Sequence, residues 1–175
     1  MPARRQVLAI GGGVFAALGR PRALWADPVE SVEMKGTARG ERIWFAPVGL
    51  AVMPGTTVRF TNRDPGNSHT STAYHPDILD RQLRIPPDAA PWDSDFLLPG
   101  ESFEVTLTVP GVYDYYCMPH EMAGMVGRIV VGRPGDPGWQ GAAPDSADLE
   151  PDALAGFPPV DEILAKGRIL KEEAR

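Results

Sequence analysis

Two segments of the chain alternate between apolar and polar residues, and a Pro-Gly turn precedes each. Residues 53–62, MPGTTVRFTN, place Val58 and Phe60 on one face and polar residues on the other. Residues 98–111, LPGESFEVTLTVPG, repeat this pattern between two Pro-Gly pairs. A period of two between turn signals predicts half-buried strands of an antiparallel sandwich or barrel. No stretch with a helical period interrupts residues 31–132, so an all-β domain is expected.

The pattern breaks at residues 75–98, HPDILDRQLRIPPDAAPWDSDFLL, where four prolines argue against a long regular element. We expect a long excursion here, with one helical turn near residues 78–83. Beyond the predicted strands the chain becomes rich in proline and glycine. Residues 133–175 are therefore predicted to form a C-terminal extension that lies over the domain surface or is partly disordered. Residues 160–174, VDEILAKGRILKEEA, are compatible with a short amphipathic helix, weakened by Gly167.

The first 26 residues have the layout of an export signal. A basic start, PARRQ, leads into twelve apolar or glycine residues, VLAIGGGVFAAL, and a small residue precedes Asp27. Twelve residues are too few to span a bilayer, which takes about 20, and the Arg4-Arg5 pair resembles a twin-arginine signal. We expect residues 1–26 to be cleaved, the alternative being an uncleaved anchor, and residues 27–132 to form the domain. The predicted location is the periplasm or the outer face of the cytoplasmic membrane, without stable membrane insertion after cleavage.

The charge of the chain limits its partners. The full sequence carries 17 basic and 23 acidic residues, and four of the basic residues but none of the acidic ones lie in residues 1–26. The remainder therefore has a net charge of −10. Nucleic acid binding needs a basic surface and is not expected. A basic protein partner suits this charge better.

Cys117 is the only cysteine of the chain, which excludes an internal disulfide. An exported protein normally uses cysteines in pairs, and an exposed free thiol would be oxidised. A buried inert thiol, an intermolecular bridge and a metal ligand remain as interpretations. Burial alone does not explain why His120 and Met125 follow Cys117 at such short distances.

A metal site needs one further ligand, and the chain has only three histidines. His69 follows a predicted strand and a polar turn, as a second loop at one end of a sandwich would. His75 is the competing ligand, displaced into the proline-containing excursion. Two histidines, one thiolate and a weak axial thioether form the ligand set of blue copper centres, whereas structural zinc sites prefer four strong ligands. Met118 and Met122 are interpreted as apolar lining near this site.

Residues 113–132, YDYYCMPHEMAGMVGRIVVG, resemble the C-terminal copper loop of the cupredoxins, in particular the plastocyanin and pseudoazurin branch. The resemblance covers about residues 31–132 and implies a Greek-key β-sandwich with one type 1 copper ion. It places the copper ligands at His69, Cys117, His120 and Met125. Many members have Asn directly after the first histidine, where it braces the two ligand loops, but this chain has Thr70.

The resemblance also implies a function: a small soluble carrier of single electrons that transforms no substrate. Its copper would cycle between Cu(I) and Cu(II), and electrons would pass through the exposed ring edge of His120. The expected partners are redox proteins with a basic surface, a cytochrome or an oxidoreductase. Acidic side chains such as Asp114, Glu121 and Glu104 are expected to steer the encounter.

The alternation before the copper loop predicts which tyrosines are buried. Tyr113 and Tyr115 share the face of Cys117 and are expected in the core. Tyr116 should point outward together with Asp114. In the family that outward tyrosine can lie beside a partner-docking surface.

Two other classes of function, enzymes and copper-delivery proteins, fit the sequence less well than an electron carrier. Multicopper oxidases and nitrite reductases need further copper centres built largely from histidines, which three histidines cannot supply. Cys-His nucleophilic catalysis lacks an evident orienting acid. We therefore expect no enzymatic activity. A copper-binding or delivery protein without an electron-carrier role is the alternative, although such proteins more often use open sites rich in Met or Cys.

Overall fold

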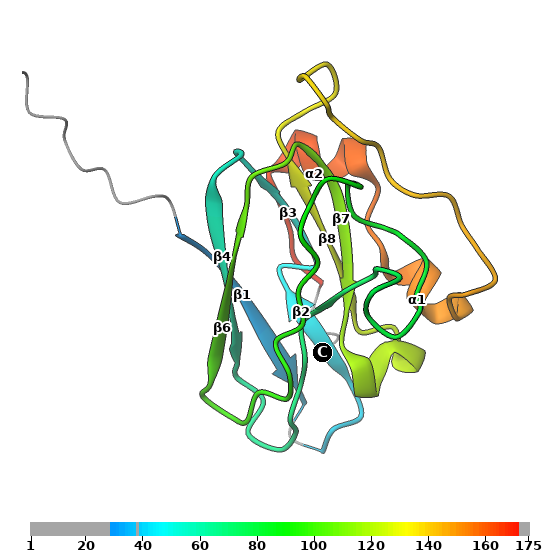
Figure 1. Cartoon of the computed structure of the whole chain (residues 1–175). Helices are drawn as coiled ribbons and strands as arrows, with labels where there is room; N and C mark the ends of the chain where they lie inside the picture. Colours follow the sequence, from blue (N-terminus) through cyan, green and yellow to red (C-terminus); the bar gives the residue numbers. More distant parts are fainter. Residues whose placement is uncertain (1–28, 38, 172–175) are drawn as a thin grey trace, which may run out of the picture.

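The computed structural model describes residues 29–37 and 39–171 and shows two β-sheets packed face to face (Figure 1). The predicted export signal, residues 1–26, lies outside the described residues. Within the described ranges no helix is long and apolar enough to cross a membrane. The elements are β1 Val29–Gly36, β2 Ile43–Ala46, β3 Gly49–Val52, β4 Thr56–Asn62, β5 Thr72–Ala73, β6 Ser102–Leu107, β7 Gly111–Tyr116, the 3-10 helix η1 Met118–Ala123, β8 Val126–Val131, α1 Pro151–Gly156, α2 Val160–Lys166 and β9 Arg168–Ile169.

The strand order confirms the predicted sandwich but not its purely antiparallel character. One sheet has the order β2-β1-β4-β6 and the other β5-β7-β8-β3-β9. The pairs β1–β4 and β3–β8 are parallel, and the other pairs are antiparallel. Parallel neighbours need a crossover connection. In both parallel pairs, other strands lie between the two partners in the sequence. The chain therefore crosses from one sheet to the other between them.

The predicted alternation of buried and exposed residues holds on β4 and β6. Val58 and Phe60 on β4 are fully buried between the sheets, whereas Arg59 is exposed. The core is aromatic: the ring of Tyr115 lies edge-on to Phe60 at 5.2 Å, and also to Phe45 at 4.8 Å between centroids. Edge-to-face aromatic pairs add stability beyond the area they bury. The core packs directly beneath the loop that carries Cys117.

The helical turn expected near residues 78–83 is absent from the described structure. The amide of Ile78 donates to the carbonyl of His75, and Leu79 and Asp80 both adopt positive φ, 57° and 53°. Two consecutive left-handed residues form a turn and cannot continue a right-handed helix. The excursion instead lies along the sandwich, with an isolated bridge between His69 and Leu97.

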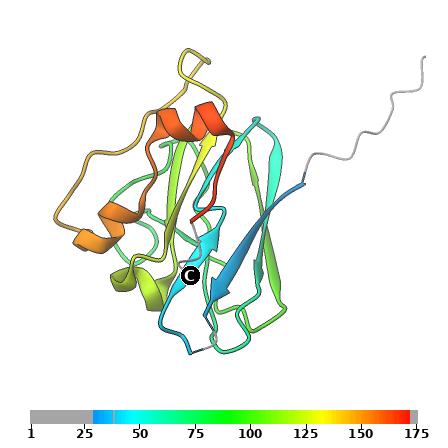
Figure 2. The same ribbon diagram turned by 180° about the vertical axis from the view of Figure 1, so that it is seen from behind.

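The C-terminal extension is ordered over its described part and covers the outer face of the second sheet (Figures 1 and 2). The predicted short helix is confirmed as α2, which ends at Lys166 just before Gly167, and Ile163 on it is fully buried with Val112 and Val130. Helix α1 and strand β9 were not predicted. β9 extends the sheet by pairing with β3, where Ile169 lies opposite Gly49.

The prediction that Tyr116 and Asp114 point into solvent is wrong, because the outer face of their sheet is covered. The backbone alternates as expected, but the face opposite the core is also buried, and Tyr116 is 1% exposed and Asp114 0%. Leu149 and Ala153 of the extension pack in the cluster that contains Tyr116. The tyrosine cannot therefore border a docking surface in this fold.

Asp114 sits between two arginines beneath the extension. Its carboxylate accepts from Arg84 Nε at 3.0 Å and from Arg128 Nε at 2.7 Å. The side chains of Arg84 and Asp114 are both 0% exposed. The Phe157 ring lies over both guanidinium groups, with centroid distances of 5.1 Å and 5.0 Å.

The extension also supplies a backbone acceptor to each of these arginines. Arg84 donates to the carbonyl of Pro144 at 2.9 Å, and Arg128 donates to the carbonyl of Pro158 at 3.0 Å. A buried charge is tolerated only when it is paired and hydrogen-bonded. Arg128 on β8 and Arg84 in the excursion therefore depend on the extension that caps them.

We predict that Asp114→Asn destabilises the protein by about 3–5 kcal/mol, because it leaves two buried guanidinium groups without their counter-charge. The unfolding midpoint in urea measures this. Glu104→Gln is the matched control, since it also removes a carboxylate from an arginine, Arg59, but at an exposed pair. Its cost should stay below about 1 kcal/mol. Equal costs for the two variants would show that the buried cluster is not a main source of stability.

Candidate metal centre

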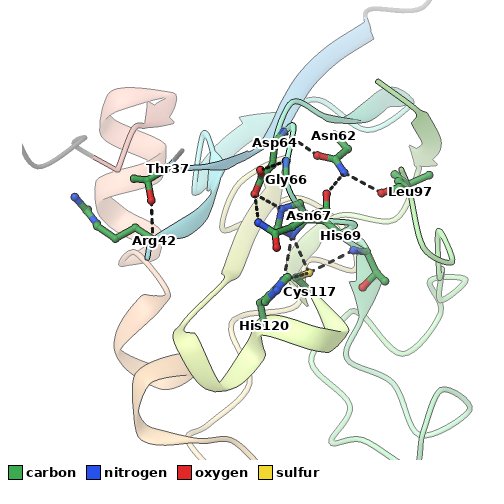
Figure 3. Close-up of polar contacts among 11 residues, drawn as sticks. Thr37, Arg42, Asn62, Asp64, Gly66, Asn67, His69, Leu97, Cys117 and His120 are labelled. Carbon is green, nitrogen blue, oxygen red and sulfur yellow. Dashed lines mark hydrogen bonds and ion pairs between the residues drawn. The ribbon is translucent and has the colours of Figure 1, made fainter. Parts of the chain in front are cut away.

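Two loops at one end of the sandwich bring three predicted ligands together (Figure 3). His69 comes after β4 and its polar turn, Cys117 follows β7 directly, and His120 lies in η1. Their ligand atoms all lie within 4.8 Å of one another. Cys117 Sγ is 3.5 Å from His69 Nδ1 and 3.4 Å from His120 Nδ1, and the two Nδ1 atoms are 3.1 Å apart. Both imidazoles thus turn the same ring nitrogen toward the thiol.

Met125 lies on the return from this loop, immediately before β8, and is fully buried. Its amide donates to the carbonyl of His120 at 3.2 Å, and its carbonyl accepts from the amide of Cys117 at 3.0 Å. Gly124 permits this return because its φ is +71°, and a Cβ there would lie 3.0 Å from the carbonyl oxygen of Asp152. The backbone therefore holds Met125 directly against the cysteine.

The other candidate residues take different positions. Met122 is 75% exposed, whereas Met118 is half-buried against the cluster of Tyr116 and Val126. His75 contacts Asp77, with 3.7 Å between Nδ1 and the carboxylate. Among the described residues, the cluster of His, Cys and carboxylate groups able to hold a metal contains His69 and not His75.

Thr70 makes the brace that the family's asparagine would make. Its amide donates to Cys117 Sγ at 3.3 Å, and its hydroxyl accepts from the amide of Met118 at 2.8 Å. The hydroxyl is supported in turn by Thr72 Oγ1 at 2.9 Å. A hydroxyl therefore suffices to join the two ligand loops.

Burial determines the protonation of the donor atoms before a metal binds. It raises the pKa of the Cys117 thiol to about 11, although hydrogen bonds from Thr70 and His120 oppose the shift. Burial also lowers the pKa values of His69 and His120 below the ordinary range, so both imidazoles are neutral at pH 7. A neutral imidazole offers a lone pair directly, whereas the thiol must lose its proton when a metal binds.

The donor set fits copper. Two imidazole nitrogens and one sulfur converge at short range, and a buried thioether follows on the same loop. Soft sulfur donors and imidazole together suit copper, while a site for magnesium or calcium would use oxygen ligands.

Sequence reasoning missed Asp64, which lies behind His69. Its Oδ2 is 3.1 Å from His69 Nε2, and both side chains are buried. Asn62 spans the same loop by donating to the carbonyls of Asn67 and Leu97. The sequence does contain a sign of this turn. Residues 62–67 combine three Asn or Asp residues with a Pro-Gly pair, and such side chains form tight turns by hydrogen-bonding to the nearby backbone.

Glu121 also departs from its prediction as an exposed steering group. It is 9% exposed and accepts two hydrogen bonds of 2.7 Å from Arg81 and one of 2.7 Å from the hydroxyl of Tyr74. With Asp114 buried as well, Glu104 alone of the three named acidic groups reaches solvent, and it pairs with Arg59. Local acidic groups on the copper loop therefore do not form a steering patch.

Comparisons with known proteins identify a copper-binding family. Residues 32–132 match the family described as "Copper binding proteins, plastocyanin/azurin family". The chain is 34% identical over 129 residues to chloroplastic plastocyanin of Chlamydomonas reinhardtii, covering 74% of this chain and 83% of that protein. It is 33% identical to chloroplastic plastocyanin of Oryza sativa subsp. indica, covering 73% and 80%. A solved pseudoazurin from Sinorhizobium meliltoi shares 33% identity and a TM-score of 0.48 over 62% of this chain and 77% of that one. The chain belongs to the plastocyanin/azurin family of copper-binding proteins, and its cofactor is copper.

Proposed function

We propose that this protein is an exported carrier of single electrons, with copper held by His69, Cys117, His120 and Met125. The observation that supports it most is the convergence of three donor atoms within 4.8 Å at the meeting of two hydrogen-bonded loops. Copper bound there would supply the chemistry, by accepting and releasing one electron between Cu(II) and Cu(I).

The residues around the donors keep the site in one arrangement. Thr70 ties the histidine loop to the cysteine loop, and the paired backbone of Cys117 and Met125 closes the second loop on itself. A cage held this way needs little rearrangement when its charge changes by one unit. Small rearrangement is what fast electron exchange requires of the protein.

The route for the electron follows from burial. His69 and Cys117 are fully buried, whereas His120 is half-buried and lies beside the exposed Pro119 and Met122. The ring of His120 is therefore the ligand placed to meet a docked protein. A closed site of this kind favours electron transfer over copper delivery, since delivery needs access to the metal itself.

We predict that Cys117→Ser abolishes the intense visible absorption of the copper-loaded protein but leaves the domain folded. The thiolate is the only strong soft donor of the cluster, and the charge-transfer band of a copper–thiolate bond depends on it. Absorption spectra and far-ultraviolet circular dichroism measure colour and folding separately. A serine variant that keeps the intense band would contradict the ligand set.

We predict that His69→Gly loses the native copper spectrum while His75→Gly retains it. His69 Nδ1 is 3.5 Å from Cys117 Sγ, whereas His75 contacts Asp77 instead. Copper titration of both variants followed by absorption decides between them. The reverse result would identify His75, in the excursion, as the copper ligand.

We predict that Met125→Leu raises the reduction potential and that Met122→Leu changes it far less. Loss of a thioether donor weakens Cu(II) binding more than Cu(I) binding, and Met125 is buried at the site whereas Met122 is 75% exposed. Voltammetry of the two variants provides the comparison. A large shift for Met122→Leu without one for Met125→Leu would place the axial ligand three residues upstream.

The proposed partners are basic redox proteins, a cytochrome or an oxidoreductase. The net charge of −10 beyond residue 26 supports a long-range attraction to a basic partner. The attraction comes from the whole chain, because the copper loop itself has no exposed acidic patch. We predict that the electron-transfer rate with a basic cytochrome falls as salt rises, because a Debye length of about 10 Å at 0.1 M screens this attraction. Stopped-flow rates over a salt series test it. A flat dependence would indicate docking through apolar contacts around His120 instead.

A further inference from the structure

A buried carboxylate stands behind the first histidine of the copper site. His69 turns Nδ1 toward Cys117, and its opposite nitrogen, Nε2, is 3.1 Å from Asp64 Oδ2 (Figure 3). The side chains are 0% and 1% exposed, so the pair is shielded from bulk solvent. The His69 ring therefore faces a carboxylate with one nitrogen and the other donor atoms of the copper site with the second nitrogen.

Three further hydrogen bonds hold Asp64 in this position. Its Oδ1 accepts from the amide of Gly66 at 2.8 Å, and its Oδ2 accepts from Asn67 Nδ2 at 2.8 Å. Its own amide donates to Asn62 Oδ1 at 2.9 Å. The carboxylate is thus fixed by the turn around it and does not depend on His69 for its orientation.

The neighbouring strand leaves space for this carboxylate. Gly36, the last residue of β1, has no side chain, and a Cβ there would lie 1.9 Å from Asp64 Oδ2. Any other residue at position 36 would push the carboxylate out of place. The local packing is therefore compatible with Asp64 only because residue 36 is glycine.

We infer that Asp64 is a positioning residue that fixes the tautomer of His69 and lowers the reduction potential of the copper site. This inference rests on the proposed role of His69 as a copper ligand. A carboxylate acceptor beside Nε2 keeps the proton on that nitrogen and leaves the Nδ1 lone pair free for the metal.

The effect on potential follows from charge. A carboxylate hydrogen-bonded to a ligating imidazole makes the ring a stronger donor. A fixed negative charge in a buried site also favours the more positive oxidation state of the metal. Both effects stabilise Cu(II) relative to Cu(I), and both lower the potential.

The test compares Asp64→Asn with wild type and with Asp93→Asn. Asp93 is exposed and accepts a hydrogen bond from Thr72, which supports the brace made by Thr70, so the control removes one negative charge without touching a ligand. We expect Asp64→Asn to weaken Cu(II) binding relative to Cu(I) at least tenfold. For a one-electron couple that corresponds to a potential raised by about 59 mV. Asp93→Asn should shift it much less.

A second measurement on the wild-type chain covers the case in which Asp64→Asn does not fold. Nitrogen-15 NMR of the metal-free protein reports which ring nitrogen of His69 carries the proton, and we expect it on Nε2. A proton on Nδ1, or an unchanged potential in a folded Asp64→Asn variant that still shows the intense copper band, would overturn the inference alone. A wild-type protein without that band would instead overturn the proposed function.

Discussion

The two hydrogen bonds of Thr70 hold the copper site together. Its amide reaches Cys117 Sγ and its hydroxyl receives the amide of Met118, so a single residue joins the loop after β4 to the loop after β7. Neither loop contains a complete ligand set by itself. The distances from His69 to Cys117 and to His120 depend on this junction, because His69 lies on the other loop.

The C-terminal extension gives the sandwich a second buried face. Together with Tyr74 and with Arg84 of the excursion, it covers Tyr116 and Asp114 on β7. Its Phe157 and two prolyl carbonyls cap the arginines that pair with Asp114. The extension also reaches the copper loop, because Arg81 binds both the Asp148 carbonyl and Glu121. The face beside Tyr116 is thereby closed, and the proposed docking site lies at an exposed place beside His120.

The sequence was sufficient where the governing interactions are local. Alternation predicts the burial of Val58 and Phe60, and the spacing of Cys117, His120 and Met125 predicts a compact ligand loop. It was insufficient where distant segments meet. Alternation shows which side of β7 carries Tyr116 but not that a segment more than thirty residues later covers that side. Asp64 was missed for a similar reason, since its role appears only once the fold brings the turn behind His69 and against Gly36.

The visible spectrum of the copper-loaded protein, recorded before and after addition of ascorbate, tests the central claim most directly. A thiolate and two imidazoles closed around copper predict an intense absorption band that ascorbate bleaches and that a mild oxidant restores. The band should persist through repeated cycles, because the cage does not open when the electron is exchanged. A protein that binds copper without this band, or that releases copper on reduction, would contradict the account and favour copper delivery.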